Sequence, residues 1–253
     1  MLIRTLCSEQ ASIVAAVVCS LIVAGFLKGI IGVGMPVVAL PLLSQFIDIK
    51  SAAMLLSVPL IFGNLPQALE GGKTGQCLMQ LMPVILGMIP GLFLGVRVLL
   101  ALDANVAKIG AGLVLMGVGG VTLLAPKLQL KSRLVLPTGI TFGFFGGILG
   151  GIAAMPGPFS YCCLQRLRGK AFTKEASLYL VVSAGLLAIL LTASRQFSWL
   201  DVSVSTAAML PVVLGMYVGQ HMRDKIAPET FARLVLIAVI AAGAELARHG
   251  FFN

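Results

Sequence analysis

Two glycine-rich segments, each closed by a Met-Pro pair, hold the residues best suited to bind a ligand. The first runs from Gly25 to Pro36 and the second from Gly143 to Pro158. A helix that begins at a proline presents unpaired backbone N–H groups and about half a positive charge, so it can bind an anion without a charged side chain. The positions expected to contact such a ligand are Gly32, Gly34, Met35, Pro36, Gly151, Met155, Pro156 and Gly157.

The glycines of these segments also allow a simpler interpretation. Small residues four positions apart let two membrane helices pack closely, and Gly25/Gly29 and Gly143/Gly147 have this spacing. Close packing does not account for the Met-Pro pairs, because a broken helix loses backbone hydrogen bonds and occurs in a membrane where it lines a cavity. We therefore favour a binding role for the breaks.

A lysine lies deep in the first apolar segment. Lys28 has no acidic residue near it in the sequence, and burying a charge in a bilayer costs about 2.5 kcal/mol or more. An anionic substrate would be a natural partner for its ammonium group. Equally, the side chain could reach the membrane surface or bind carbonyl groups of the other glycine-rich segment. The second segment has Gly146 at the matching place, so the fold does not require the charge.

Four further polar residues could donate hydrogen bonds to an anion. Asn64 and Gln67 lie near the end of a proline-containing apolar segment, and their amides could bind anion oxygens or join neighbouring helices. Ser160 and Tyr161 follow the second Met-Pro pair, and their hydroxyls could bind substrate or backbone carbonyls. Both interpretations stay open for these residues.

Enzyme chemistry finds little support. The sequence has no H-E-x-x-H zinc motif, no G-x-S-x-G nucleophile motif and no G-x-x-x-x-G-K-[ST] nucleotide loop. The five cysteines lack metal-ligand spacing, and only the pair Cys162-Cys163 beside the second break suggests thiol chemistry. We expect no catalytic residue, metal or cofactor, and expect that the protein is not an enzyme.

The composition places these residues in a membrane. Mean hydropathy is +1.04, and only 11% of residues are charged, against about 25% in soluble domains. The net charge of +9 fits loops that face anionic lipid better than a nucleic-acid partner. Spans this apolar are expected to be helices of roughly 20 residues. They are expected at about 12–34, 51–69, 77–100, 106–125, 134–154, 174–194, 200–221 and 231–247.

The chain is predicted to consist of two homologous halves, residues 1–125 and 134–253, joined by a basic cytoplasmic linker at 126–133. Besides the glycine segments, Pro83–Gly91 matches Pro211–Gly219. Shorter apolar stretches at 36–47 and 157–165 follow the breaks and are predicted to be re-entrant half-helices. Each half then makes an odd number of passes, so the halves are inverted, which the Lys/Arg bias favours. One continuous kinked span at each break would instead make the halves parallel.

These features resemble the sulfite exporter TauE/SafE family, also called the toluene sulfonate uptake permease family. The resemblance rests on the duplicated glycine-rich break before a proline, the small size and the two halves around a basic linker, and it covers almost the whole chain. It implies a multi-pass inner-membrane permease for sulfur-containing anions. The family-like positions are Gly32, Gly34, Pro36, Gly150, Gly151 and Pro156.

The expected function is secondary transport of an organosulfonate bound at mid-membrane between the two broken helices. Met35 and Met155 depart from a plain glycine pattern, and their adaptable apolar side chains would suit an organic body. Export of sulfite or another small inorganic sulfur anion is the alternative, and a membrane scaffold is a third possibility. A proton or sodium ion could be coupled to transport, and a homodimer could form through the glycine-rich faces.

Overall fold

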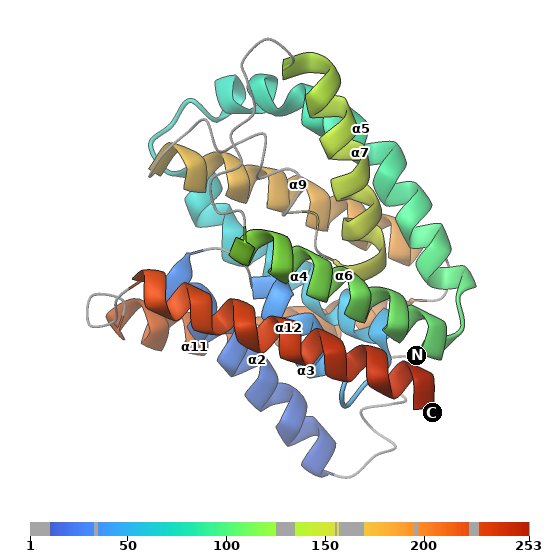
Figure 1. Ribbon diagram of the computed structural model, residues 1–253. Coiled ribbons are helices and arrows are strands. Elements are labelled where there is room, and N and C mark those ends of the chain that lie inside the picture. Colours follow the sequence, from blue (N-terminus) through green and yellow to red (C-terminus); the bar gives the residue numbers. More distant parts are fainter. Residues whose placement is uncertain are drawn as a thin grey trace.

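The computed structural model describes residues 11–32, 35–124, 135–154, 156, 170–194, 197–222 and 228–252. Within these residues every regular element is an α-helix. The first half of the chain contributes α2 (Ala11–Ile31), α3 (Met35–Leu43), α4 (Ile49–Leu69), α5 (Thr74–Ala101) and α6 (Ala104–Leu124). The second half contributes α7 (Val135–Ala153), α9 (Lys170–Ala193), α10 (Trp199–Ala207), α11 (Met209–Met222) and α12 (Pro228–Phe252) (Figure 1).

Helices occupy every apolar segment that the sequence predicts to span the bilayer. Within the described residues, five helical segments are long and apolar enough to cross a membrane: α2, α4, α5, most of α9, and α10 together with α11. The prediction of an all-α membrane protein is confirmed. The number of eight crossings and the two re-entrant half-helices stay predictions, and the predicted half-helix at 157–165 and the predicted linker at 126–133 lie outside the described residues.

One predicted span, 200–221, is interrupted. Helix α10 ends at Ala207 and α11 begins at Met209. Pro211 explains the interruption, because a proline lacks an N–H group and its ring clashes with the carbonyl of the residue four positions earlier. At the other end of α10, Asp201 accepts from the Ser198 N–H at 2.7 Å in a capping box, so this buried carboxylate has a structural role.

The most extensive helix pairings each join one half of the chain to the other. They are α5 with α7, α6 with α12, α2 with α11, and α4 with α9. In the repeat, α2 corresponds to α7, α4 to α9, α5 to α11 and α6 to α12. Exchanging the two halves therefore converts the α2–α11 pair into the α7–α5 pair, and leaves the α4–α9 and α6–α12 pairs unchanged. Figure 1 shows α4 and α9 between the α5–α7 pair and the α2–α11 pair. Neither half therefore packs as a separate bundle.

Helices α4 and α9 run antiparallel. The Nζ atom of Lys174, near the start of α9, donates to the backbone oxygen of Glu70 at 2.7 Å and to that of Gly72, just past the end of α4. One turn further along α9, the Ser177 hydroxyl donates to the Gln67 side chain at 3.0 Å. Residue numbers therefore rise along one helix as they fall along the other.

Helices α6 and α12 are also antiparallel, whereas the remaining two pairs run parallel. A Cβ atom built on Gly112 would lie 2.5 Å from the Gly243 oxygen, and one built on Gly250 would lie 2.6 Å from the Asn105 oxygen. In the α4–α9 and α6–α12 pairs, each helix thus packs antiparallel against the corresponding helix of the other half.

Glycines make the two parallel pairs equivalent at the atomic level. Built Cβ atoms on Gly25 and Gly143 would overlap the carbonyl oxygens of Val212 and Val84, respectively, which occupy matching places in the repeat. The glycines of the partner helices contact α2 and α7 in the same way; these are Gly215 and Gly219 in α11, and Gly87 and Gly91 in α5. The packing interpretation of the first glycines in each segment is confirmed.

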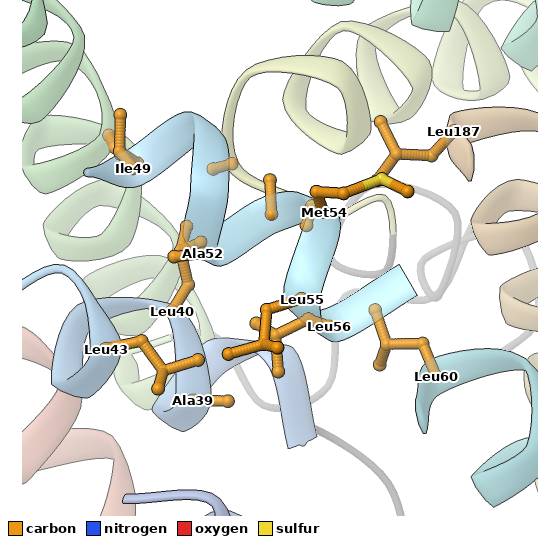
Figure 2. Close-up of a cluster of buried hydrophobic side chains, with 14 of the residues drawn as sticks. Ala39, Leu40, Leu43, Ile49, Ala52, Met54, Leu55, Leu56, Leu60 and Leu187 are labelled. Carbon is orange, nitrogen blue, oxygen red and sulfur yellow. The ribbon is translucent and has the colours of Figure 1, made fainter. Parts of the chain in front are cut away.

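The largest hydrophobic core surrounds α3 and the first half of α4. Figure 2 shows side chains of α3 gathered against those of α4, with Met54 against Leu187 of α9. The labelled α3 and α4 residues are Ala39, Leu40, Leu43, Ile49, Ala52, Met54, Leu55, Leu56 and Leu60. Helix α3, which follows the first break, is therefore held inside the protein.

Candidate anion-binding site

The first break is built on a left-handed glycine. Gly32 has φ +89°, and its N–H donates to the Lys28 carbonyl at 2.7 Å. This hydrogen bond closes the last turn of α2, which ends at the glycine. Glycine suits the position because residues with a side chain avoid this backbone conformation. Helix α3 begins three residues later, at Met35, and ends at Leu43, earlier than the predicted 36–47. Met35 and Pro36 are both buried.

Lys28 is buried against an amide side chain. Only 2% of its surface is exposed, and its Nζ donates to Oδ1 of Asn64, which is fully buried. The Asn64 amide nitrogen donates to the Leu60 oxygen at 2.7 Å, so the orientation of the amide is fixed. The side chain is thus directed into the protein rather than along its surface, and among the described residues of the second glycine-rich segment none forms a hydrogen bond with it.

A glycine makes room for the lysine stem. A Cβ atom built on Gly63 would lie 3.4 Å from Cε of Lys28 and 3.7 Å from Sδ of Met216. The ammonium is thus approached from α4 and α11 as well as from its own helix. Within the described residues, no carboxylate forms an ion pair with Lys28.

Gln67 lies on the same side of α4, between the break and α9. Its Oε1 accepts the hydrogen bond from Ser177, and its Nε2 is 3.9 Å from a Cβ built on Gly32. At 1.5 Å per residue, Asn64 lies about 9 Å along the helix axis from Glu70. The polar side chains therefore collect toward the end of α4 that Lys174 binds.

The second break has apolar surroundings where it is described. Ala154 also has a left-handed conformation, with φ +51°. A Cβ built on Gly150 would lie 3.0 Å from atoms of both Leu92 and Pro156, and Gly151 packs against the backbone of α5 at Gly95. The remaining predicted positions lie outside the described residues: Gly34, Met155, Gly157, Ser160 and Tyr161.

Comparison with known protein families bears directly on this arrangement. The model of the sulfite exporter TauE/SafE family matches residues 17–246, a range that includes the described parts of both breaks. The chain belongs to this family. No curated protein and no solved structure matches the chain.

Membership in the TauE/SafE family indicates a multi-pass membrane transporter of sulfite or related anions. The described residues contain no group of three or more His, Cys, Asp or Glu side chains that could hold a metal. Lys28, Asn64, Gln67 and Gly32 are the predicted site residues that the structure brings together.

Sequence reasoning missed Ser177. It lies 110 positions from Gln67, and no pattern in the sequence indicates that the two residues are in contact. The available signal was a hydroxyl residue in an apolar segment, which Ser57 and Ser183 share. Ser57 instead donates to the Met54 oxygen of its own helix at 2.7 Å. Glu175, also buried in α9, was missed as well.

Proposed function

We propose that this TauE/SafE family member is a secondary transporter that binds an organosulfonate beside the break that follows α2. The buried ammonium of Lys28, paired with a neutral amide, is the observation that carries the proposal. A lysine has three N–H donors, and the hydrogen bond to Asn64 uses one of them. A sulfonate or sulfite oxygen would supply the missing negative charge.

Further donors surround the same place. The Nε2 group of Gln67 lies near Gly32, and the first backbone N–H groups of α3 follow within a few residues. Gly151, Met155, Pro156, Gly157, Ser160 and Tyr161 would complete the site from the second half. An oxyanion with three oxygens suits such a set of donors from several elements.

The two halves are proposed to be inverted in the membrane. If the halves were parallel, α4 would run in the same direction as its counterpart α9, and α6 in the same direction as α12. The antiparallel direction of both pairs supports inversion. Movement of one half against the other would then expose the site to each side in turn.

Met35 supports an organic part in the substrate. Its side chain is 1% exposed and belongs to the hydrophobic core, so the break has an apolar side as well as a polar one. An aryl or alkyl group would suit that side. Export of sulfite is the second candidate, and the description of the family favours it. An inner-membrane location, coupling to a proton or sodium ion, and a homodimer belong to the same proposal.

The test is ligand-dependent thermal stability of the purified protein, with sulfite, thiosulfate, taurine, sulfoacetate and toluenesulfonate, and benzoate as the carboxylate control. Lys28→Ala should weaken binding about ten- to a hundredfold, because a hydrogen bond to a charged group contributes roughly 1.5–3 kcal/mol. Lys50→Ala is the matched control, since Lys50 Nζ donates to the Leu100 oxygen at 3.2 Å, away from the site.

Preference for toluenesulfonate over sulfite would support the organosulfonate, and the reverse would favour the sulfite exporter. Stabilisation by none of the sulfur anions would contradict both. Uptake into proteoliposomes, with proton and sodium gradients imposed separately, would identify a coupling ion.

A further inference from the structure

We propose that Ser177 is a positioning residue, which holds the Gln67 amide so that its N–H groups are directed at the break and can donate to the transported anion. This inference rests on the proposed anion site. It adds a residue from the second half of the chain to a site whose other described polar side chains come from the first half.

Ser177 and Gln67 meet at the contact between α9 and α4. Ser177 is fully buried in α9, and its hydroxyl donates to Gln67 Oε1 at 3.0 Å. The oxygen and the nitrogen lie on opposite sides of an amide group. Holding the oxygen against α9 therefore directs Nε2 away from α9, toward Gly32, where a built Cβ would lie 3.9 Å away.

The orientation of this amide decides what the anion meets. An amide can present two N–H donors or one acceptor oxygen. Donors attract a sulfonate oxygen, whereas the amide oxygen would repel it. In the structure the Ser177 hydroxyl donates to Oε1 and so holds Gln67 with Nε2 on the side of the break, and less free energy is spent on ordering Gln67 when the anion binds.

The same contact links the anion site to the interface between the halves. Ser177 lies one turn along α9 from Lys174, which binds the backbone at the end of α4. Both contacts would change together if α9 moved relative to α4. Gln67 would then lose its fixed orientation, and the site would lose a donor.

The experiment measures dissociation constants for sulfite and for toluenesulfonate, together with the melting temperature of the anion-free protein. The variants are Ser177→Ala, Ser177→Cys, Ser177→Thr and Gln67→Glu, with Ser57→Ala as the control. Ser57 is an equally buried serine whose hydroxyl bonds within its own helix. Cysteine nearly preserves the volume but is a weak donor, and threonine restores the hydroxyl.

Ser177→Ala and Ser177→Cys should raise the dissociation constant roughly two- to tenfold, as expected for loss of a neutral hydrogen bond. Ser177→Thr should restore the wild-type value, and Ser57→Ala should not change it. Gln67→Glu keeps an acceptor for Ser177 but replaces the donors with an oxygen, so it should weaken binding more than Ser177→Ala without lowering the melting temperature.

Two results would overturn the inference. If Ser177→Ala and Ser177→Cys lower the melting temperature but leave both dissociation constants unchanged, the hydrogen bond is structural only. If Lys28→Ala abolishes binding while all Ser177 variants bind as wild type, the proposed site stands and the role of Ser177 is wrong. Absence of binding by the wild-type protein would instead overturn the proposed function, and this inference with it.

Discussion

Lys28 is a buried charged side chain whose hydrogen-bond partner among the described residues is a neutral amide, that of Asn64. The ammonium donates to the Asn64 amide oxygen, and the amide nitrogen of the same side chain donates to the Leu60 oxygen, which fixes the orientation of the amide. A neutral partner satisfies one donor but leaves the positive charge uncompensated. A buried aspartate in place of Asn64 would compensate it permanently, and an arriving anion would then bring an excess negative charge.

This reasoning predicts the effect of Asn64→Asp. The variant should keep or raise the melting temperature, because a buried ammonium gains a charged partner, while anion affinity falls at least about tenfold. Ligand-dependent thermal stability measures both quantities. Gln80→Glu adds the same charge at an exposed position of α5 and should leave affinity unchanged. Unchanged affinity in Asn64→Asp would show that the anion does not bind at Lys28.

At the scale of elements, the left-handed conformation of Gly32 allows α2 to end and α3 to begin within a few residues. Among the described residues other than its chain neighbours, the nearest atom to a Cβ built on Gly32 is Gln67 Nε2 at 3.9 Å, so these residues leave space for a methyl group and it is the backbone conformation that opposes it. Contacts do not explain a glycine here, but its φ of +89° does.

We therefore expect Gly32→Ala to destabilise the protein by about 1–2 kcal/mol through backbone strain, and to lower transport by disturbing the break. Thermal unfolding and proteoliposome uptake measure the two effects. Gly185→Ala is the matched control, since it lies in α9 with open space around its Cβ position and no left-handed φ. It should be neutral or stabilising by up to about 1 kcal/mol. Equal behaviour of the two variants would contradict the strain argument.

A second prediction at this scale concerns the parallel α5–α7 pair. A Cβ on Gly91 would overlap the Phe144 oxygen, so Gly91→Ala must push two backbones apart. The expected loss is about 1–3 kcal/mol, as for overpacking of a core. Gly117→Ala in α6, where no described atom lies within 4 Å of the built Cβ, should not destabilise. Thermal unfolding in the same detergent compares the two, and a stable Gly91→Ala protein would argue against close packing of this pair.

At the scale of the whole molecule, the halves pack mainly against each other. Antiparallel α4–α9 and α6–α12 pairs are what a two-fold axis in the membrane plane produces, because that operation reverses the direction of a spanning helix. An axis along the membrane normal would preserve the direction. If the halves are inverted, the turns that precede corresponding helices of the two halves therefore face opposite sides of the membrane.

Inverted halves predict the sides of two turns. In a cysteine-free background, Gln76→Cys, near the start of α5, should be protected in intact cells from a membrane-impermeant thiol reagent, and Trp199→Cys, at the first residue of α10, should be labelled. Asp103→Cys is the positive control, because one crossing separates it from the 126–133 linker, and with that linker in the cytoplasm it faces outside whether the halves are inverted or parallel. Gln76 and Trp199 are exposed on the protein surface, so their labelling reports the side of the membrane on which each lies. Protection of Trp199→Cys would instead indicate parallel halves.

The sequence by itself determined the helices and the family. Lipid cannot bond to backbone groups, so each apolar stretch must satisfy its own hydrogen bonds as a helix, and that requirement is local. The same locality located both breaks at Gly32 and near Pro156, and marked Lys28 as an unusual charge. It did not detect the interruption before Pro211, where hydropathy stays high across two helices.

Only the tertiary structure decided which residues meet. Asn64 lies 36 positions from Lys28, and Ser177 lies 110 positions from Gln67. These contacts depend on how α4 packs against α2 and α9, which no local pattern encodes. The glycines illustrate the same limit: their spacing allowed close packing or a binding site, and the partner helix decided that Gly25 and Gly143 pack while Gly32 turns the chain.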